Sequence, residues 1–122
     1  MVTDNETWLI ETGDLVIRKE VSSGLLSLSD IERAIYCFWV IDYSVRNSGT
    51  LGAVEDLYPD AFLELSQYAR TNNLSHLALI CETTNRSEEG FCENYYRLFE
   101  AACDDIRAVY QRTEQIVGPE RG

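Results

Sequence analysis

An aspartate lies on the inner side of the most apolar segment of this chain. Asp42 follows an uninterrupted apolar run at residues 34–41. It comes eleven residues after Ile31, which places it about 20° from that residue on a helix of 100° per residue. We therefore expect the carboxylate to point inward. An unpaired buried carboxylate costs several kcal/mol, so Asp42 should accept hydrogen bonds from Arg46 or from backbone amides of the loop at 47–52. In that arrangement, the carboxylate would staple the loop to the helix end.

Nucleophilic chemistry is the alternative for Asp42 and for the cysteines. A small hydrolase would pair a thiolate or carboxylate with a base, and His76 is the only histidine. No spacing in the sequence supports such a pair, and we expect His76 to be partly exposed or hydrogen-bonded. The four cysteines lack the spacing of metal and redox motifs, and we interpret them as reduced core thiols. They are Cys37, Cys81, Cys92 and Cys103. No phosphate-binding glycine motif is present. The sequence therefore assigns no catalytic residue, no metal and no cofactor.

Carboxylates also recur along the last helical segment. Glu89, Glu93, Glu100 and Asp104 fall within about 60° of one another on a helical wheel. Arg97 and Arg107 lie on or near the same face. One interpretation is a solvated surface neutralised by i,i+3 and i,i+4 ion pairs. The other is a row of carboxylates at phosphate-like spacing, presented to a basic protein groove. Acids elsewhere would extend that row if the helices align. They are Asp56, Asp60, Glu64, Glu82 and Glu88.

The overall charge limits the partners. Acidic residues number 21 against 10 basic ones, for a net charge of -11. Direct binding to nucleic acid or to an anionic membrane requires clustered Lys and Arg, so both are excluded as ligands. A basic protein is the expected partner, although net charge can also serve solubility alone. The N-terminal residues lack a secretory pattern and no apolar run reaches membrane-spanning length, which predicts a cytoplasmic protein.

These residues must be positioned by helices, and the chain of 122 residues has the length of one domain, residues 1–122. Ser29 and Glu32 form a capping box that starts the central helix at 30–47, whose apolar residues cover every side. Asn47 or Gly49 supplies the left-handed stop. Residues 5–20 fit either a helix interrupted by Gly13 or a hairpin, and we favour the helix.

Shorter helical segments follow the central helix. They are predicted at 53–57, from Pro59 to residue 71, and at 74–81. The last helix, at 88–114, is expected to start near Ser87 and to carry an apolar stripe spaced 4, 3, 4, 3 and 4. The stripe comprises Cys92, Tyr96, Phe99, Cys103, Ile106 and Tyr110. It predicts core packing or a homodimer seam. The fold class is all-α, a compact bundle of about five helices around the central helix.

The segment SLSDIERAIYCFWVIDYSVRNSGTLGAVEDLY, residues 27–58, resembles a widespread family of small bacterial domains, mostly of unknown function, that includes an acidic DNA-mimic protein. The family pattern is a Ser-Leu-Ser entry, a Glu-Arg pair, an aliphatic-aromatic helix and a Glu-Val-x-Asn-Gly-Gly-Phe signature. The matching positions are Ser27, Leu28, Ser29, Glu32, Arg33, Trp39, Asp42, Val45, Asn47 and Gly49. The chain departs from the signature at Ser44, Ser48 and Thr50.

The resemblance implies an all-helical domain that can dimerise and that uses surface carboxylates to occupy the DNA-binding face of a regulator. Together with the charge, it makes a non-enzymatic acidic module that binds a basic protein the leading hypothesis. A DNA-mimic inhibitor or regulator is its sharpest form. An immunity or antitoxin protein that blocks a basic toxin is the alternative, and a small hydrolase is the alternative from another class.

Overall fold

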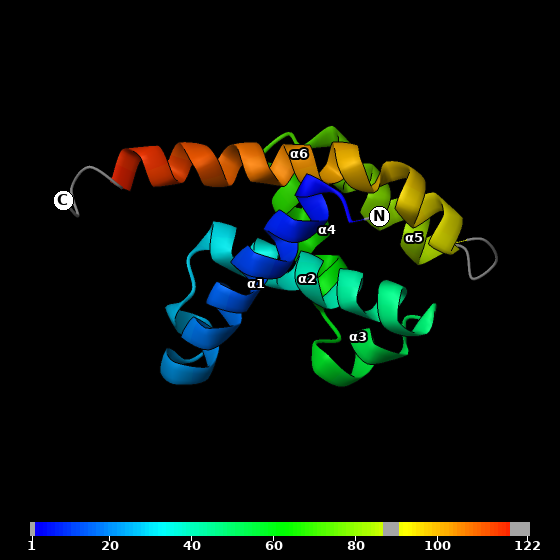
Figure 1. Cartoon of the computed structure of the whole chain (residues 1–122), viewed down its shortest axis with the longest axis horizontal. Helices are drawn as coiled ribbons and strands as arrows, with labels where there is room; N and C mark the ends of the chain where they lie inside the picture. The colour runs from blue at the N-terminus through cyan, green and yellow to red at the C-terminus, as the bar shows by residue number, and fades with distance from the viewer. Residues whose placement is uncertain (1, 87–90, 118–122) are drawn as a thin grey trace.

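The computed structural model describes residues 2–86 and 91–117, with side chains described at 2–82 and 92–113. Those residues form helices joined by short turns and contain no strand (Figure 1). The all-α prediction is therefore confirmed. The elements are α1 (Asp4–Ser23), the 3-10 turn η1 (Leu25–Ser27), α2 (Asp30–Ser48), α3 (Gly52–Leu57), α4 (Ala61–Thr71), α5 (Ser75–Arg86) and α6 (Phe91–Val117).

The N-terminal segment is one helix, as favoured over the hairpin. The Thr3 side chain accepts from the Glu6 backbone while Glu6 reaches back to Thr3, a capping box that starts α1. The helix then continues through Gly13, which is buried. A Cβ at this position would lie 2.4 Å from Cδ1 of Trp39 in α2. Glycine is thus present because the Trp39 ring fills the space where its side chain would be.

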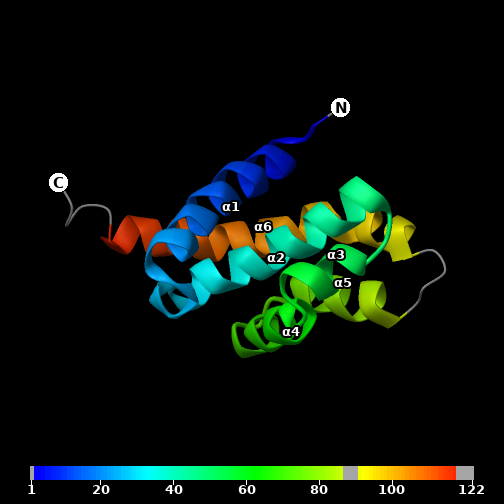
Figure 2. The ribbon, with the colours of Figure 1, turned by 90° about the horizontal axis from the view of Figure 1, so that it is seen from below.

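Helix α2 is the centre of the fold, as predicted. It begins at the Ser29–Glu32 capping box and ends at Gly49, whose φ of 66° is left-handed. Its residues Ile35, Cys37, Phe38 and Val40 have no exposed surface. The helix contacts α1, α3, α4 and α6, and Figure 2 shows these helices arranged around it. An apolar run on all sides of a helix requires such neighbours.

The later helices differ from their predicted ends. Pro59 does not open α4, because Pro59 and Asp60 form a turn in which the Ala61 amide bonds to the Tyr58 carbonyl at 3.1 Å. The helix therefore starts at Ala61. Helix α5 is longer than residues 74–81 and runs from Ser75 to Arg86. Helix α6 extends past 114 to Val117, while its predicted start near Ser87 lies outside the described residues.

Helices α5 and α6 lie side by side as an antiparallel pair, and α6 is the longest helix of the described chain. The predicted apolar stripe is only partly buried. Phe99, Cys103 and Ile106 are in the core, but Tyr96 is 47% exposed. The buried face also includes Tyr95 and further residues that the stripe omitted. They are Leu98 and Ala102. Helix α6 is thus rotated relative to the predicted stripe.

Replacement of Gly13 by Ala should destabilise the protein. Alanine improves helix propensity by about 1 kcal/mol, but overpacking against Trp39 costs about 1–3 kcal/mol. Gly52→Ala is the matched control, because the nearest atom to its new Cβ would be Thr50 Oγ1 at 3.5 Å, an ordinary contact. Urea unfolding of both variants checks this. A Gly13→Ala protein as stable as Gly52→Ala would contradict the packing assignment.

Candidate functional site

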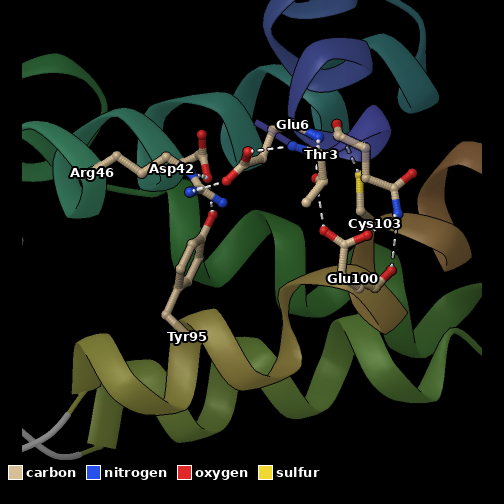
Figure 3. Close-up of polar contacts among 8 residues, drawn as sticks. Thr3, Glu6, Asp42, Arg46, Tyr95, Glu100 and Cys103 are labelled. Atoms are coloured by element: carbon tan, nitrogen blue, oxygen red, sulfur yellow. Dashed lines mark hydrogen bonds and ion pairs between the residues drawn. The ribbon is translucent and has the colours of Figure 1, made fainter. Parts of the chain in front are cut away.

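The buried Asp42 carboxylate receives its donors from two helices. The Tyr95 hydroxyl of α6 donates to Oδ1 of Asp42 at 2.6 Å, and Nε of Arg46 donates to the same oxygen at 2.7 Å (Figure 3). Asp42 is only 4% exposed, so the inward orientation and the Arg46 contact are confirmed. No local sequence pattern predicts Tyr95 as a partner of Asp42, because 53 positions separate the two residues.

The predicted role of Asp42 as a staple for the loop at 47–52 is wrong. The neighbouring Ser44 performs that function, because its hydroxyl donates to the Thr50 carbonyl at 2.6 Å. Asn47 and Gly49 act locally. The Asn47 side chain donates to the Tyr43 carbonyl at 3.0 Å, and Gly49 supplies the left-handed cap. The serine is close in sequence to the loop, whereas the carboxylate is turned toward α6.

Arg46 connects α2 with α1 and with α6. Its Nη1 forms an ion pair with Glu6 of α1. Its guanidinium carbon lies 4.6 Å from the ring centroid of Phe99 and 5.1 Å from that of Tyr96, both in α6. Arginine stacks on aromatic rings while it donates to carboxylates, so a single side chain makes all of these contacts. We call the group Glu6, Asp42, Arg46 and Tyr95 the polar junction.

Burial dominates the protonation of the polar junction. It raises the pKa of Asp42, and the donors Tyr95 and Arg46 offset this effect only in part. Burial also raises the pKa of Tyr95 well above its ordinary value, with the Asp42 charge acting in the same direction. Tyr95 is therefore a protonated donor at neutral pH. Because the Tyr95 and Arg46 donors both bind Oδ1 of Asp42, we interpret Asp42 as a structural residue.

Two of the predicted surface acids bind α1. The Asn5 side-chain amide donates to Glu100 Oε1 at 2.9 Å and to Asp104 Oδ1 at 3.0 Å. The Thr3 hydroxyl donates to Glu100 Oε2 at 2.9 Å. These neutral donors fix the carboxylates without cancelling their charge. Asn5 is 6% exposed, and no spacing rule could have found it, because it lies 95 residues from Glu100.

The arginines of α6 do not neutralise its acids in the predicted way. Nη1 of Arg107 donates to Asp4 at 2.7 Å and to Asn5 Oδ1 at 3.0 Å. Arg97 donates to the Asn94 side chain at 3.2 Å. Within residues 92–113, no ion pair joins either arginine to an acid of α6. The i,i+3 and i,i+4 interpretation is wrong for both arginines: α1 provides competing partners for Arg107, and Arg97 bonds to the neutral Asn94 side chain of its own helix.

The remaining predicted acids have separate positions. Glu82 of α5 and Glu93 of α6 are exposed, close to the ends of the helices that residues 87–90 connect. Neither forms an ion pair within the described chain. Glu88 and Glu89 lie outside the described residues. The structure thus brings Glu100 and Asp104 together on α6, with Glu93 two turns earlier on the same helix.

The thiols and the histidine are separated. All four cysteines are free, as predicted, and Cys37, Cys81 and Cys103 are buried. Burial raises the pKa of all three buried thiols, that of Cys81 to about 12, which disfavours the nucleophilic thiolate. Cys92 is half-buried, and its thiol donates to the Gly49 carbonyl at 3.4 Å.

His76 contacts Asp105 and no described thiol. Its Nδ1 lies 3.3 Å from Asp105 Oδ1, while its backbone amide donates to Oδ2 at 2.9 Å. The Leu77 amide donates to the same oxygen at 3.2 Å. Asp105 thereby caps the first turn of α5 from α6, where the helix dipole favours an anion. The expectation that His76 is partly exposed or hydrogen-bonded is confirmed, because its side chain is both.

The described residues contain no group of three or more His, Cys, Asp or Glu side chains that could hold a metal ion. A search of the described helices for a long apolar span that could cross a membrane finds none. Comparison with protein-family models, with curated proteins and with solved structures gives no match. The resemblance of residues 27–58 to the bacterial helical family accordingly stays a prediction.

Tyr95→Phe should destabilise the protein by about 1–3 kcal/mol, because the buried Asp42 loses one of its donors. Tyr96→Phe is the matched control. Its ring is half exposed, and its hydroxyl has no described hydrogen bond, so a change within about 0.5 kcal/mol is expected. Chemical unfolding measures the free energy of unfolding of both variants. Equal stability of the two variants would show that the Tyr95 contact contributes nothing.

The raised pKa of Asp42 predicts the sign of a pH effect. From the ordinary Asp pKa of 3.8 up to the raised value, the native protein keeps a proton that the unfolded chain has released. The contribution of Asp42 to stability is full below that window and decreases as pH rises through it. Unfolding of wild type and Asp42→Asn between about pH 3.5 and about pH 7 isolates this effect. A wild-type advantage that grows with pH would contradict it.

Proposed function

We propose that this protein is a non-enzymatic acidic module that binds a basic protein, most specifically one that otherwise binds DNA. The observation that carries the proposal is the way Glu100 and Asp104 are held. Neutral donors from α1 bind both carboxylates, and no described ion pair engages either one. Fixed anions on a helix face can substitute for the regularly spaced phosphates that a basic groove recognises.

The use of cations elsewhere in the molecule supports the proposal. Ion pairs within the chain engage five of the described basic side chains. They are Arg18, Lys19, Arg33, Arg46 and Arg107. Their partners lie on α1, α2 and α4, and none of these ion pairs engages Glu93, Glu100 or Asp104. The net charge of -11 adds long-range attraction for a basic partner.

A second exposed acidic group provides a natural comparison. Glu55, Asp56 and Asp60 lie on α3 and the turn that follows it, and all three are exposed. No described ion pair or hydrogen bond holds their side chains. Carboxylates without such contacts contribute to net charge but have less defined spacing. We therefore assign the partner surface to α6, where Glu100 and Asp104 are hydrogen-bonded, and use the α3 group as the matched control.

The test uses a DNA-binding partner recovered at low salt and a labelled duplex that this partner binds. Glu93→Gln, Glu100→Gln and Asp104→Asn together remove three charges from α6, and Glu55→Gln, Asp56→Asn and Asp60→Asn remove three from the control group. The α6 triple variant should bind the partner at least about tenfold more weakly, and the control variant should bind nearly as wild type. Fluorescence anisotropy reports displacement of the duplex.

Equal weakening by both triple variants would show that only net charge matters and would refute the α6 surface. A complex that leaves the duplex bound would refute DNA mimicry. The affinity for the partner should also fall steeply with added salt, because exposed charges are screened over about 10 Å at 0.1 M and about 3 Å at 1 M.

A further inference from the structure

A groove of about 480 Å³ lies between α2 and α4, away from the polar junction. Ala34 and Cys37 of α2, both buried, form its apolar floor. Its α4 side includes Tyr68 and Thr71. The volume is within the range of small-molecule sites. Most of the lining side chains are polar, so a ligand would be held by its charged or hydrogen-bonding groups more than by apolar contact.

The charge of the groove is decided by one carboxylate. Arg33 and Glu64 both line it, but they neutralise each other: Nε of Arg33 donates to Glu64 Oε1 at 2.8 Å and Nη2 donates to Oε2 at 3.3 Å. The Tyr58 hydroxyl also bonds to Glu64. Glu64 is thus saturated with donors. Asp30 is the remaining charged lining residue, and it forms no ion pair within the described chain.

Tyr68 adds an aromatic face beside that carboxylate. Tyr68 and Asp30 line the same groove. Burial raises the pKa of Tyr68, and the negative charge of Asp30 acts in the same direction. Arg112 of α6 acts on the same hydroxyl in the opposite direction, although it does not line the groove. A groove lined by both a carboxylate and an aromatic side chain is a favourable setting for an organic cation.

We propose that this groove binds an alkylammonium or guanidinium group, which pairs with Asp30 and lies against the ring of Tyr68. The hydrocarbon stem of such a ligand would cover the floor at Ala34 and Cys37. A free polyamine and an arginine side chain of a protein share this chemistry. The inference does not rest on the α6 surface, because it can be tested with small probes in the absence of any partner.

Titration calorimetry at low salt with spermidine, and separately with the capped peptide acetyl-Gly-Arg-Gly-amide, tests the proposal. Binding of spermidine alone would identify a free polyamine as the ligand, and binding of the peptide would identify a protein side chain. Asp30→Asn should weaken the bound probe about tenfold, the usual effect of losing one charge-assisted hydrogen bond. Glu11→Gln removes the same charge from an exposed α1 position without a described ion pair, and should leave the affinity within about twofold.

Two further measurements separate binding from folding and from bulk charge. Asp30 occupies the first turn of α2, where its charge also favours the helix, so thermal unfolding of Asp30→Asn must accompany the titration. Thr71→Trp fills the groove from an exposed position and should abolish binding with the charge unchanged. Equal affinities of Asp30→Asn and Glu11→Gln, or no binding of either probe to wild type, would overturn the proposal.

Discussion

A carboxylate inside an apolar core must be matched by donors, and in this protein that requirement joins the helices. Asp42 takes one hydrogen bond from its own helix and one from α6, and the arginine that provides the first extends to α1. Breaking such a group by removing one partner is costly, because the other charge stays buried. The relative positions of α1, α2 and α6 are therefore specified by electrostatics in addition to packing.

The same docking of α1 decides what the surface can present. Asn5 and Thr3 reach α6 only because α1 lies across it, and their contacts convert Glu100 and Asp104 from mobile side chains into fixed ones. Arg107, which would otherwise pair along its own helix, is directed to Asp4. Core and surface are linked in this way: the helix that Arg46 holds through Glu6 is also the helix that orders the acids proposed to meet a partner.

Much of the secondary structure follows from local sequence. The capping boxes at Thr3 and Ser29, the left-handed stop at Gly49 and the apolar run of the central helix each act within one or two helical turns. Such signals are readable without a fold because the interacting atoms are close in the chain. Long-range contacts add to these local signals, as at the first turn of α5, where Asp105 of α6 accepts hydrogen bonds from the backbone amides of His76 and Leu77.

The sequence by itself determined the all-α class, the central helix and the inward direction of Asp42, and it offered Arg46 as one of two candidate donors, since all depend on helical periodicity or on neighbours one turn apart. Tertiary structure alone decided that Tyr95 would complete the Asp42 site, that Gly13 would make room for Trp39, and that α1 would bind the acids of α6. These contacts join residues far apart in the chain. Their partners are selected by how helices pack, and periodicity within a single helix carries no information about that choice.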